Sequence, residues 1–217
     1  SSQEAELFDE AIEVTSPGNV SGKYSMREAT FTPALPRFED GPIEEQVVGA
    51  DDGQTALGGG GTGSVRDACQ PLANDAAVAG RIVLIARGGC EFQIKLVHAQ
   101  EAGAIAAIVY NNTGGPIERN GDAGSVDIPA VMIGSADGQD LVASLAAEES
   151  VRIELQKGVF AQRSLVGKQL AEFSSRGPSL SEPDFVKPDV TAPGVDILAG
   201  HTPDVANGVR GETFQYL

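Results

Sequence analysis

Residues 80–110 read GRIVLIARGGCEFQIKLVHAQEAGAIAAIVY, and this stretch predicts the fold. Residues 81–86 form a continuous apolar run rich in branched side chains, which is typical of a strand buried on both faces. Residues 104–110 form a second run of the same kind. A parallel strand–helix–strand unit is therefore predicted, with the helix between the two apolar runs.

The intervening helix is predicted at residues 91–102. Phe92, Leu96 and Ala99 recur there at helical spacing and form an apolar stripe, and Lys95 lies off that stripe. The stretch thus indicates an amphipathic helix that packs one face against the strands.

Further elements extend this unit into one domain. The alternation of apolar and charged residues at 151–155 indicates a strand with one solvated face, and residues 137–147 indicate a short helix. Two more strands are predicted at residues 43–49 and 128–133. The fold class is therefore α/β and β-rich, with a compact domain at residues 43–158.

The two ends of the chain have a different character. Short apolar stretches broken by proline and glycine predict extended chain or edge strands in residues 1–42. Residues 159–217 contain few helical patterns, but they keep the apolar residues Phe173, Phe185 and Val190. We expect this tail to lack a hydrophobic core of its own and to be more mobile than residues 80–156.

Charge and hydropathy exclude several classes of partner. The chain has 31 acidic and 15 basic residues, and its net charge of −16 opposes binding to nucleic acid or to anionic lipid. It has no apolar run of about 18 residues, so no membrane span is predicted. A signal peptide is expected to have been removed or to lie upstream.

The two cysteines, Cys69 and Cys90, match no metal or redox spacing. Their spacing alone leaves two interpretations open, a disulfide or two buried reduced thiols.

Five separated motifs resemble the protease-associated (PA) domain family over about residues 43–157. They are GRIVLIARGGCEF from residue 80, Lys95, AQEAGA from residue 99, IVYNN from residue 108 and IPAVMI from residue 128. The resemblance implies a barrel-like sheet with flanking helices, in a module found within subtilisin-like proteases, some aminopeptidases and luminal sorting receptors.

A second resemblance lies in the tail. The motifs FSSRGP from residue 173 and KPDVTAPGVDILA from residue 187 are similar to the segment of subtilisin-like serine proteases that follows a PA insertion. This resemblance implies that residues 1–42 are a connector from the catalytic domain and that residues 159–217 are a partial catalytic segment without the nucleophile. We expect the chain to be an internal fragment of a secreted endopeptidase.

The resemblance also implies that this chain alone is not a peptidase. A triad needs a nucleophile, a base and an orienting acid, whereas His98 and His201 lie in no catalytic motif. Ser174 and Ser175 are structural in the family. Because the family is exported, we expect Cys69 and Cys90 to form a disulfide.

No cofactor is expected. Two distant histidines cannot build a typical catalytic zinc site. Two acidic pairs could bind calcium weakly, although neither fits the spacing of a calcium loop. These pairs are Asp51 with Asp52 and Asp137 with Asp140.

Three functions remain open. The chain is an accessory module that recruits or gates polypeptide substrates of the protease, a stand-alone sorting or receptor module, or a purely structural insertion. Its expected partners are the rest of the catalytic domain and polypeptide substrates. The candidate interaction surface lies at the ends of the buried strands and comprises Arg87, Gly88, Gly89, Glu91, Phe92, Asn111 and Asn112. Of these, Phe92 is also expected to contribute to the core.

Overall fold

The computed structural model of the chain describes most of residues 6–164 and two short strands beyond them. The described residues are 6–55, 63–117, 124, 126–164, 198–200 and 214–216. Two compact units are present, one ending at Leu165 and the other running from Val166 to Leu217.

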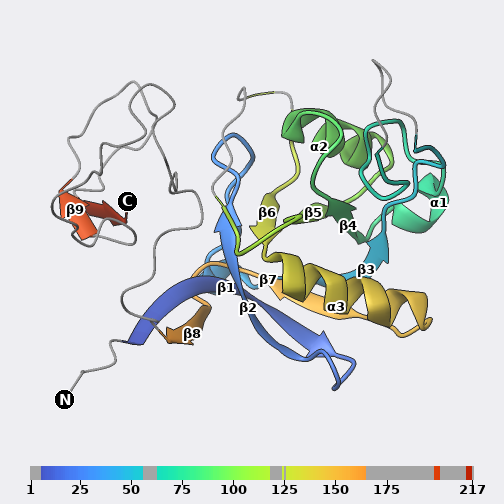
Figure 1. Cartoon of the computed structure of the whole chain (residues 1–217). Coiled ribbons are helices and arrows are strands. Elements are labelled where there is room, and N and C mark those ends of the chain that lie inside the picture. Colours follow the sequence, from blue (N-terminus) through green and yellow to red (C-terminus); the bar gives the residue numbers. More distant parts are fainter. Residues whose placement is uncertain are drawn as a thin grey trace, which may run out of the picture. The chain divides into compact units, whose positions relative to one another are not determined.

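Four parallel strands form the central part of the first unit (Figure 1). In sheet order they are β3 (Ile43–Gly49), β4 (Ile82–Ala86), β5 (Ala106–Tyr110) and β6 (Ala130–Ile133). Their register places Ile108 opposite both Leu84 and Val131. All four predicted strands are confirmed, and β3 has the predicted bounds. The other three begin slightly later than expected.

Antiparallel strands close this sheet into a seven-stranded barrel. They are β1 (Glu6–Ser16), β2 (Gly22–Glu28) and β7 (Arg152–Leu155). β7 pairs with β3, β1 pairs with β7 and β2, and β2 pairs with β6. The closed barrel confirms the β-rich α/β class, and alternate burial along β7 confirms its single solvated face.

The barrel begins before the predicted range of 43–158, and strand pairing continues after it. β1 and β2 both lie within residues 1–42, where extended chain or edge strands are predicted, and they complete the barrel. After the barrel, β8 (Phe160–Ser164) pairs antiparallel with the first half of β1. The acidic start of the chain therefore continues into β1, a strand with partners on both edges.

Helices pack against the parallel strands. α2 (Phe92–Glu101) and α3 (Ser135–Ala146) confirm the two predicted helices with slightly different ends. α2 ends before Gly103, whose φ of +81° suits a residue without a side chain. Two short elements that the sequence pattern does not predict are α1 (Asp75–Val78) and η1 (Phe38–Asp40).

Three of the parallel strands, β4, β5 and β6, contain no charged residue because both of their faces are covered. Val83 and Ile85 of β4 belong to a cluster that includes Leu96 and Ala99 of α2. Ile82 and Leu84 of β4 belong to a second cluster with residues of β1, β7 and α3. This packing explains the continuous apolar runs in the sequence.

The second unit contains the antiparallel pair of β9 (Leu198–Gly200) and β10 (Phe214–Tyr216). Phe173, Phe185 and Val190, the apolar residues noted in the tail, lie outside the described residues. In the described part of the chain, no helix is long and apolar enough to cross a bilayer.

Candidate functional site

The carboxyl ends of β4 and β5 bring together three of the seven residues of the candidate surface. Arg87 follows β4 and Asn111 follows β5, so the two residues leave neighbouring parallel strands. Arg87 Nη1 donates to Asn111 Oδ1 at 2.6 Å and, more weakly, to Asn112 Oδ1 at 3.4 Å. The Arg87 backbone N–H also donates to the Tyr110 carbonyl at 3.0 Å. This edge is therefore a hydrogen-bonded group.

Asn111 fixes this edge from inside. Its side chain is buried, and its Oδ1 also accepts the Asn112 backbone N–H at 2.9 Å. Its Nδ2 donates to the Gly115 carbonyl at 2.7 Å. The hydrogen bonds of Asn111 thus stabilise the loop, whereas Asn112 is exposed and Arg87 is half-buried. Arg87 and Asn112 are the side chains that a partner can reach.

The turn after β4 carries the other candidate residues. Gly88 and Gly89 have φ values of +116° and +82°, which side chains disfavour. Glu91 is exposed and precedes the first turn of α2. Phe92 is half-buried and meets Phe31 edge to face at a centroid distance of 6.0 Å. Phe92, the first residue of α2, packs against the hydrophobic core cluster, so its main contacts are internal.

A disulfide joins Cys69 and Cys90, whose Cα atoms are 5.6 Å apart. It connects the loop before α1 to the turn before α2. Lys95 lies directly beside it, contrary to the sequence prediction that placed this residue off the buried stripe. Only 1% of the surface of Lys95 is exposed, although its side chain ends in an ammonium group.

Backbone carbonyls explain how a lysine can be buried here. Lys95 Nζ donates to the carbonyls of Asp67 and Gly88, each at 2.5 Å, and lies 3.3 Å from Cys69 Sγ. Burial lowers the Lys95 pKa to about 8, an effect opposed by the nearby carboxylates of Asp67 and Asp52. Helical periodicity cannot reveal this role, because Asp67 is distant in the sequence.

His98 also contacts the loop that carries Cys69. Its Nδ1 lies 2.8 Å from the Ala68 carbonyl, so that nitrogen carries the proton of the hydrogen bond. The ring is half-buried against the loop, so His98 is in part a structural contact of that loop. His201, Ser174 and Ser175 lie outside the described residues.

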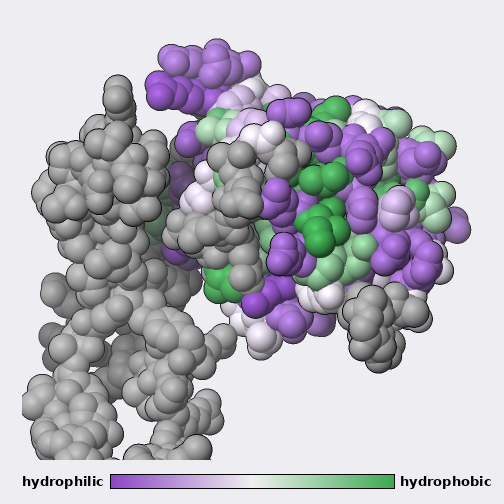
Figure 2. All heavy atoms as spheres, turned by 90° about the horizontal axis from the view of Figure 1, so that it is seen from above, coloured by the Kyte–Doolittle hydropathy of each residue, from purple (hydrophilic) through white to green (hydrophobic). Residues whose placement is uncertain are grey.

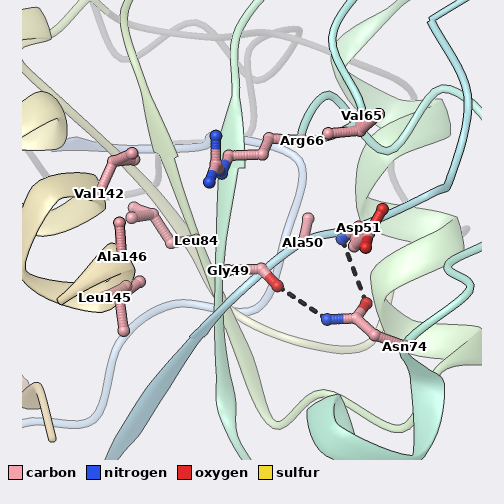
Figure 3. A pocket seen from close by; sticks show the side chains of 10 residues that line it. All are labelled: Gly49, Ala50, Asp51, Val65, Arg66, Asn74, Leu84, Val142, Leu145 and Ala146. Atoms are coloured by element: carbon pink, nitrogen blue, oxygen red, sulfur yellow. Dashed lines mark hydrogen bonds between the residues drawn. The ribbon is translucent and has the colours of Figure 1, made fainter. Parts of the chain in front are cut away.

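A cavity of about 260 Å³ opens beside the carboxyl end of β3 (Figure 3). Val142, Leu145 and Ala146 of α3 form its apolar wall, and Arg66 extends across its opposite side. Asn74 shapes its floor, because its side chain donates to the Gly49 carbonyl at 2.9 Å and accepts the Asp51 N–H at 3.1 Å. The sequence analysis does not predict this cavity.

The acidic pairs considered for calcium do not come together as a metal site. Asp52 is buried, and its two carboxylate oxygens accept the backbone N–H groups of Gln54 and Gln70. Asp137 lies on α3 with Asp140, and burial together with the Asp140 charge raises the Asp137 pKa. Within the described ranges, no cluster of three or more His, Cys, Asp or Glu side chains could hold a metal ion.

Comparison with known proteins identifies the barrel. The family described as "PA domain" matches residues 46–141. This chain contains a PA domain. The match runs from within β3 to α3, and so covers the parallel strands, the disulfide and Lys95.

Proteins similar to this PA domain chain include proteases from bacteria and a plant. The chain is 36% identical over 131 residues to the minor extracellular protease Vpr of Bacillus subtilis, covering 58% of this chain and 15% of Vpr. It is 34% identical over 139 residues to the subtilisin-like protease SBT4.4 of Arabidopsis thaliana, covering 63% of this chain and 17% of SBT4.4. It is 36% identical over 125 residues to the C5a peptidase of Streptococcus pyogenes, covering 56% of this chain and 10% of that protein. The chain thus spans under a fifth of each of these relatives.

Proposed function

We propose that this chain is the PA portion of a secreted subtilisin-like serine endopeptidase. In that protein it is a non-catalytic module that recruits polypeptide substrates or gates their access to the catalytic domain. The observation that carries this proposal is the similarity to proteases of this class, one of which is named as extracellular. The motifs at residues 173–178 and 187–199 support it, since they are similar to a catalytic-domain segment.

The ribbon of β1 and β8 supports association with a catalytic domain. Phe160 of β8 lies opposite Glu10 of β1, two residues from Phe8, so both aromatic side chains lie on one face of the ribbon. Phe8 is 62% exposed and Phe160 is 47% exposed. Exposed aromatic side chains close together favour burial against a partner. The catalytic domain is the partner we propose for this face.

Arg87 and Asn112 supply the chemistry for contact with a polypeptide. Among the described residues, no carboxylate forms an ion pair with Arg87, and its guanidinium donates to the neutral amides of Asn111 and Asn112. A guanidinium beside an exposed amide suits recognition of peptide carbonyl and carboxylate oxygens. The face of the first unit seen in Figure 2 carries hydrophilic side chains with hydrophobic ones among them.

The test uses the full-length protease with Arg87→Gln and Asn112→Ala. A recruiting role predicts that kcat/KM for a protein substrate falls about tenfold, while kcat/KM for a short chromogenic peptide is unchanged. Lys23→Ala, which removes an exposed cation from β2, serves as the control. If both substrates are cleaved at the original rates, the structural insertion becomes the better hypothesis.

The chain alone is expected to show no peptidase activity, because the sequence offers no nucleophile motif with a base and an acid. Incubation of the purified chain with casein, with and without a serine-directed inhibitor, checks this. Inhibitor-sensitive cleavage that increases with time would contradict the non-catalytic assignment.

A further inference from the structure

Lys95 brings a cation to one sulfur of the disulfide. An ammonium group has three N–H donors, and here two of them reach the carbonyls of Asp67 and Gly88. The third is available to Cys69 Sγ, 3.3 Å from Nζ. The Cys69 sulfur therefore has a charged donor beside it.

The two sulfurs lie in different surroundings. Cys69 is buried, with only 8% of its surface exposed. Cys90 is half-buried and follows the exposed Gly89 in the turn before α2. A small molecule from solvent can thus approach Cys90 more readily than Cys69.

This asymmetry fits the chemistry of thiol–disulfide exchange. In that reaction a thiolate attacks one sulfur, and the other sulfur leaves as a thiolate. Exchange is faster when the leaving thiol has a low pKa, and a neighbouring lysine cation lowers a thiol pKa. The easier approach of a thiolate to Cys90 and the stabilisation of a leaving Cys69 thiolate therefore both favour attack on Cys90.

We propose that the Cys69–Cys90 disulfide is a reversible exchange site for small thiols, at which the thiol adds to Cys90 and Cys69 leaves as a thiolate stabilised by the Lys95 ammonium. The incoming thiolate supplies the electron pair of the new bond to Cys90. The Cys69–Cys90 bond breaks, and its electron pair remains on Cys69. The thiol is oxidised into the mixed disulfide, and Cys69 is reduced.

The contacts of Lys95 also favour the reverse reaction, in which Cys69 restores the original disulfide. Its hydrogen bonds to Asp67 and Gly88 connect the same two segments as the disulfide does. When the S–S bond is open, these bonds hold the Cys69 thiolate near Cys90. Attack by Cys69 on the mixed disulfide then expels the small thiol and restores the original bond.

Other charged and titratable groups also face this site. The Asp67 and Asp52 carboxylates favour the protonated form of Lys95, and His98 contacts the adjacent Ala68 carbonyl. The Lys95 pKa of about 8 keeps most of its ammonium protonated at pH 7, and a thiolate beside it would raise that pKa further.

The first experiment measures the thiol pKa of Cys69 in the Cys90→Ser chain, from thiolate absorbance against pH. We expect a pKa below about 7.5, compared with an ordinary value of about 8.5. Adding Lys95→Met should raise the Cys69 pKa above its ordinary value, because the buried thiolate loses its cation. A Cys69 pKa of about 8.5 or more in Cys90→Ser itself would overturn the proposal.

The second experiment treats the intact chain with reduced glutathione at pH 7 and locates the adduct by mass spectrometry. The adduct is expected on Cys90, and its formation should be about tenfold slower in Lys95→Met. Lys157→Met, which removes a surface lysine paired with Glu28, should leave the rate unchanged. An adduct mainly on Cys69 would refute the proposed direction of attack, even if Lys95→Met fails to fold.

Discussion

The parallel and antiparallel parts of the barrel are held together by different polar contacts. At the carboxyl end of the parallel strands, the links between loops are buried, and they involve Asn111, Lys95 and the disulfide. The antiparallel strands instead form ion pairs at the surface, where Arg152 of β7 pairs with Glu44 of the neighbouring β3 and Lys157 pairs with Glu28 of β2. Of the antiparallel pairs within the barrel, only β1 and β2 are joined by a short connection, and the others join strands distant in the sequence. The contrast between the two parts therefore lies in where their polar contacts sit, buried at the loops of the parallel strands and at the surface of the antiparallel ones.

The largest expected difference between the two parts is in the core. Ile108 is fully buried in β5, so Ile108→Ala should lower the free energy of unfolding by about 4 kcal/mol. Phe160→Ala on β8 should cost under about 1 kcal/mol, because Phe160 is largely exposed. Urea denaturation of both variants checks this contrast. Equal losses would mean that the β8 ribbon is as tightly packed as the barrel.

Reduction of the disulfide should have the next largest effect. The sequence separation of its two cysteines is 21 residues, and opening a loop of this size costs about 3 kcal/mol in the chain-entropy model. Thermal unfolding with and without reductant measures the loss. A change below about 1 kcal/mol would show that the hydrogen bonds of Lys95 alone hold the two segments.

Asn111→Ala should cost about 2 kcal/mol, because it leaves Arg87 and the Gly115 carbonyl without their buried partner. Its exposed neighbour provides the control, as Asn112→Ala should change the free energy of unfolding by less than about 0.5 kcal/mol. Chemical denaturation of the two variants distinguishes the roles of these adjacent amides. Similar costs would contradict the buried role of Asn111.

Lys95 should give the free energy of unfolding a pH dependence that comes from the parallel part. Its pKa is about 8 in the folded chain and 10.5 ordinarily, so the unfolded chain binds more protons between these values. The cost of burying the charge is therefore fully present below pH 8 and is relieved as the pH rises from 8 to 10.5. Stability should increase across this window by at most about 1.4 kcal/mol per pH unit. Lys95→Met should remove this slope, and an unchanged slope would assign it to other groups.

The smallest effect is expected for the surface ion pair of the antiparallel part. Lys157 Nζ is 3.5 Å from Glu28 Oε1, and its side chain is 42% exposed. Lys157→Met should therefore change the free energy of unfolding by less than about 1 kcal/mol. Denaturation at low and at high salt tests this. A larger loss would mean that surface pairs hold this part as firmly as buried contacts hold the other.

The same division explains how much could be predicted from the sequence. Strands buried on both faces are continuous apolar runs, and so β4 and β5 are evident within residues 80–110. β1 is harder to predict because Glu10 and Glu13 interrupt the apolar pattern around Ala11 and Ile12. Its role in closing the barrel depends on partners as distant as β7.

The candidate site shows a similar limit. The ends of the parallel strands can be predicted from the sequence, and so can the proximity of Arg87 to Asn111. Periodicity assigns Lys95 to the solvent because it considers only the helix. The carbonyl partners of Lys95 come from Asp67 and Gly88, in loops whose paths the sequence pattern does not specify.

The pairing of β1 with β8 has a consequence for how such a domain can be gained or lost. Glu6 lies opposite Ser164, and antiparallel partners have Cα atoms about 5 Å apart. A host protein therefore has to join this domain at two backbone positions that are only as far apart as the partners in an ordinary hairpin. The entropy of closing a loop grows slowly with its length, so a folded insert with adjacent ends perturbs its host little. This geometry makes the barrel transferable between host loops as one unit.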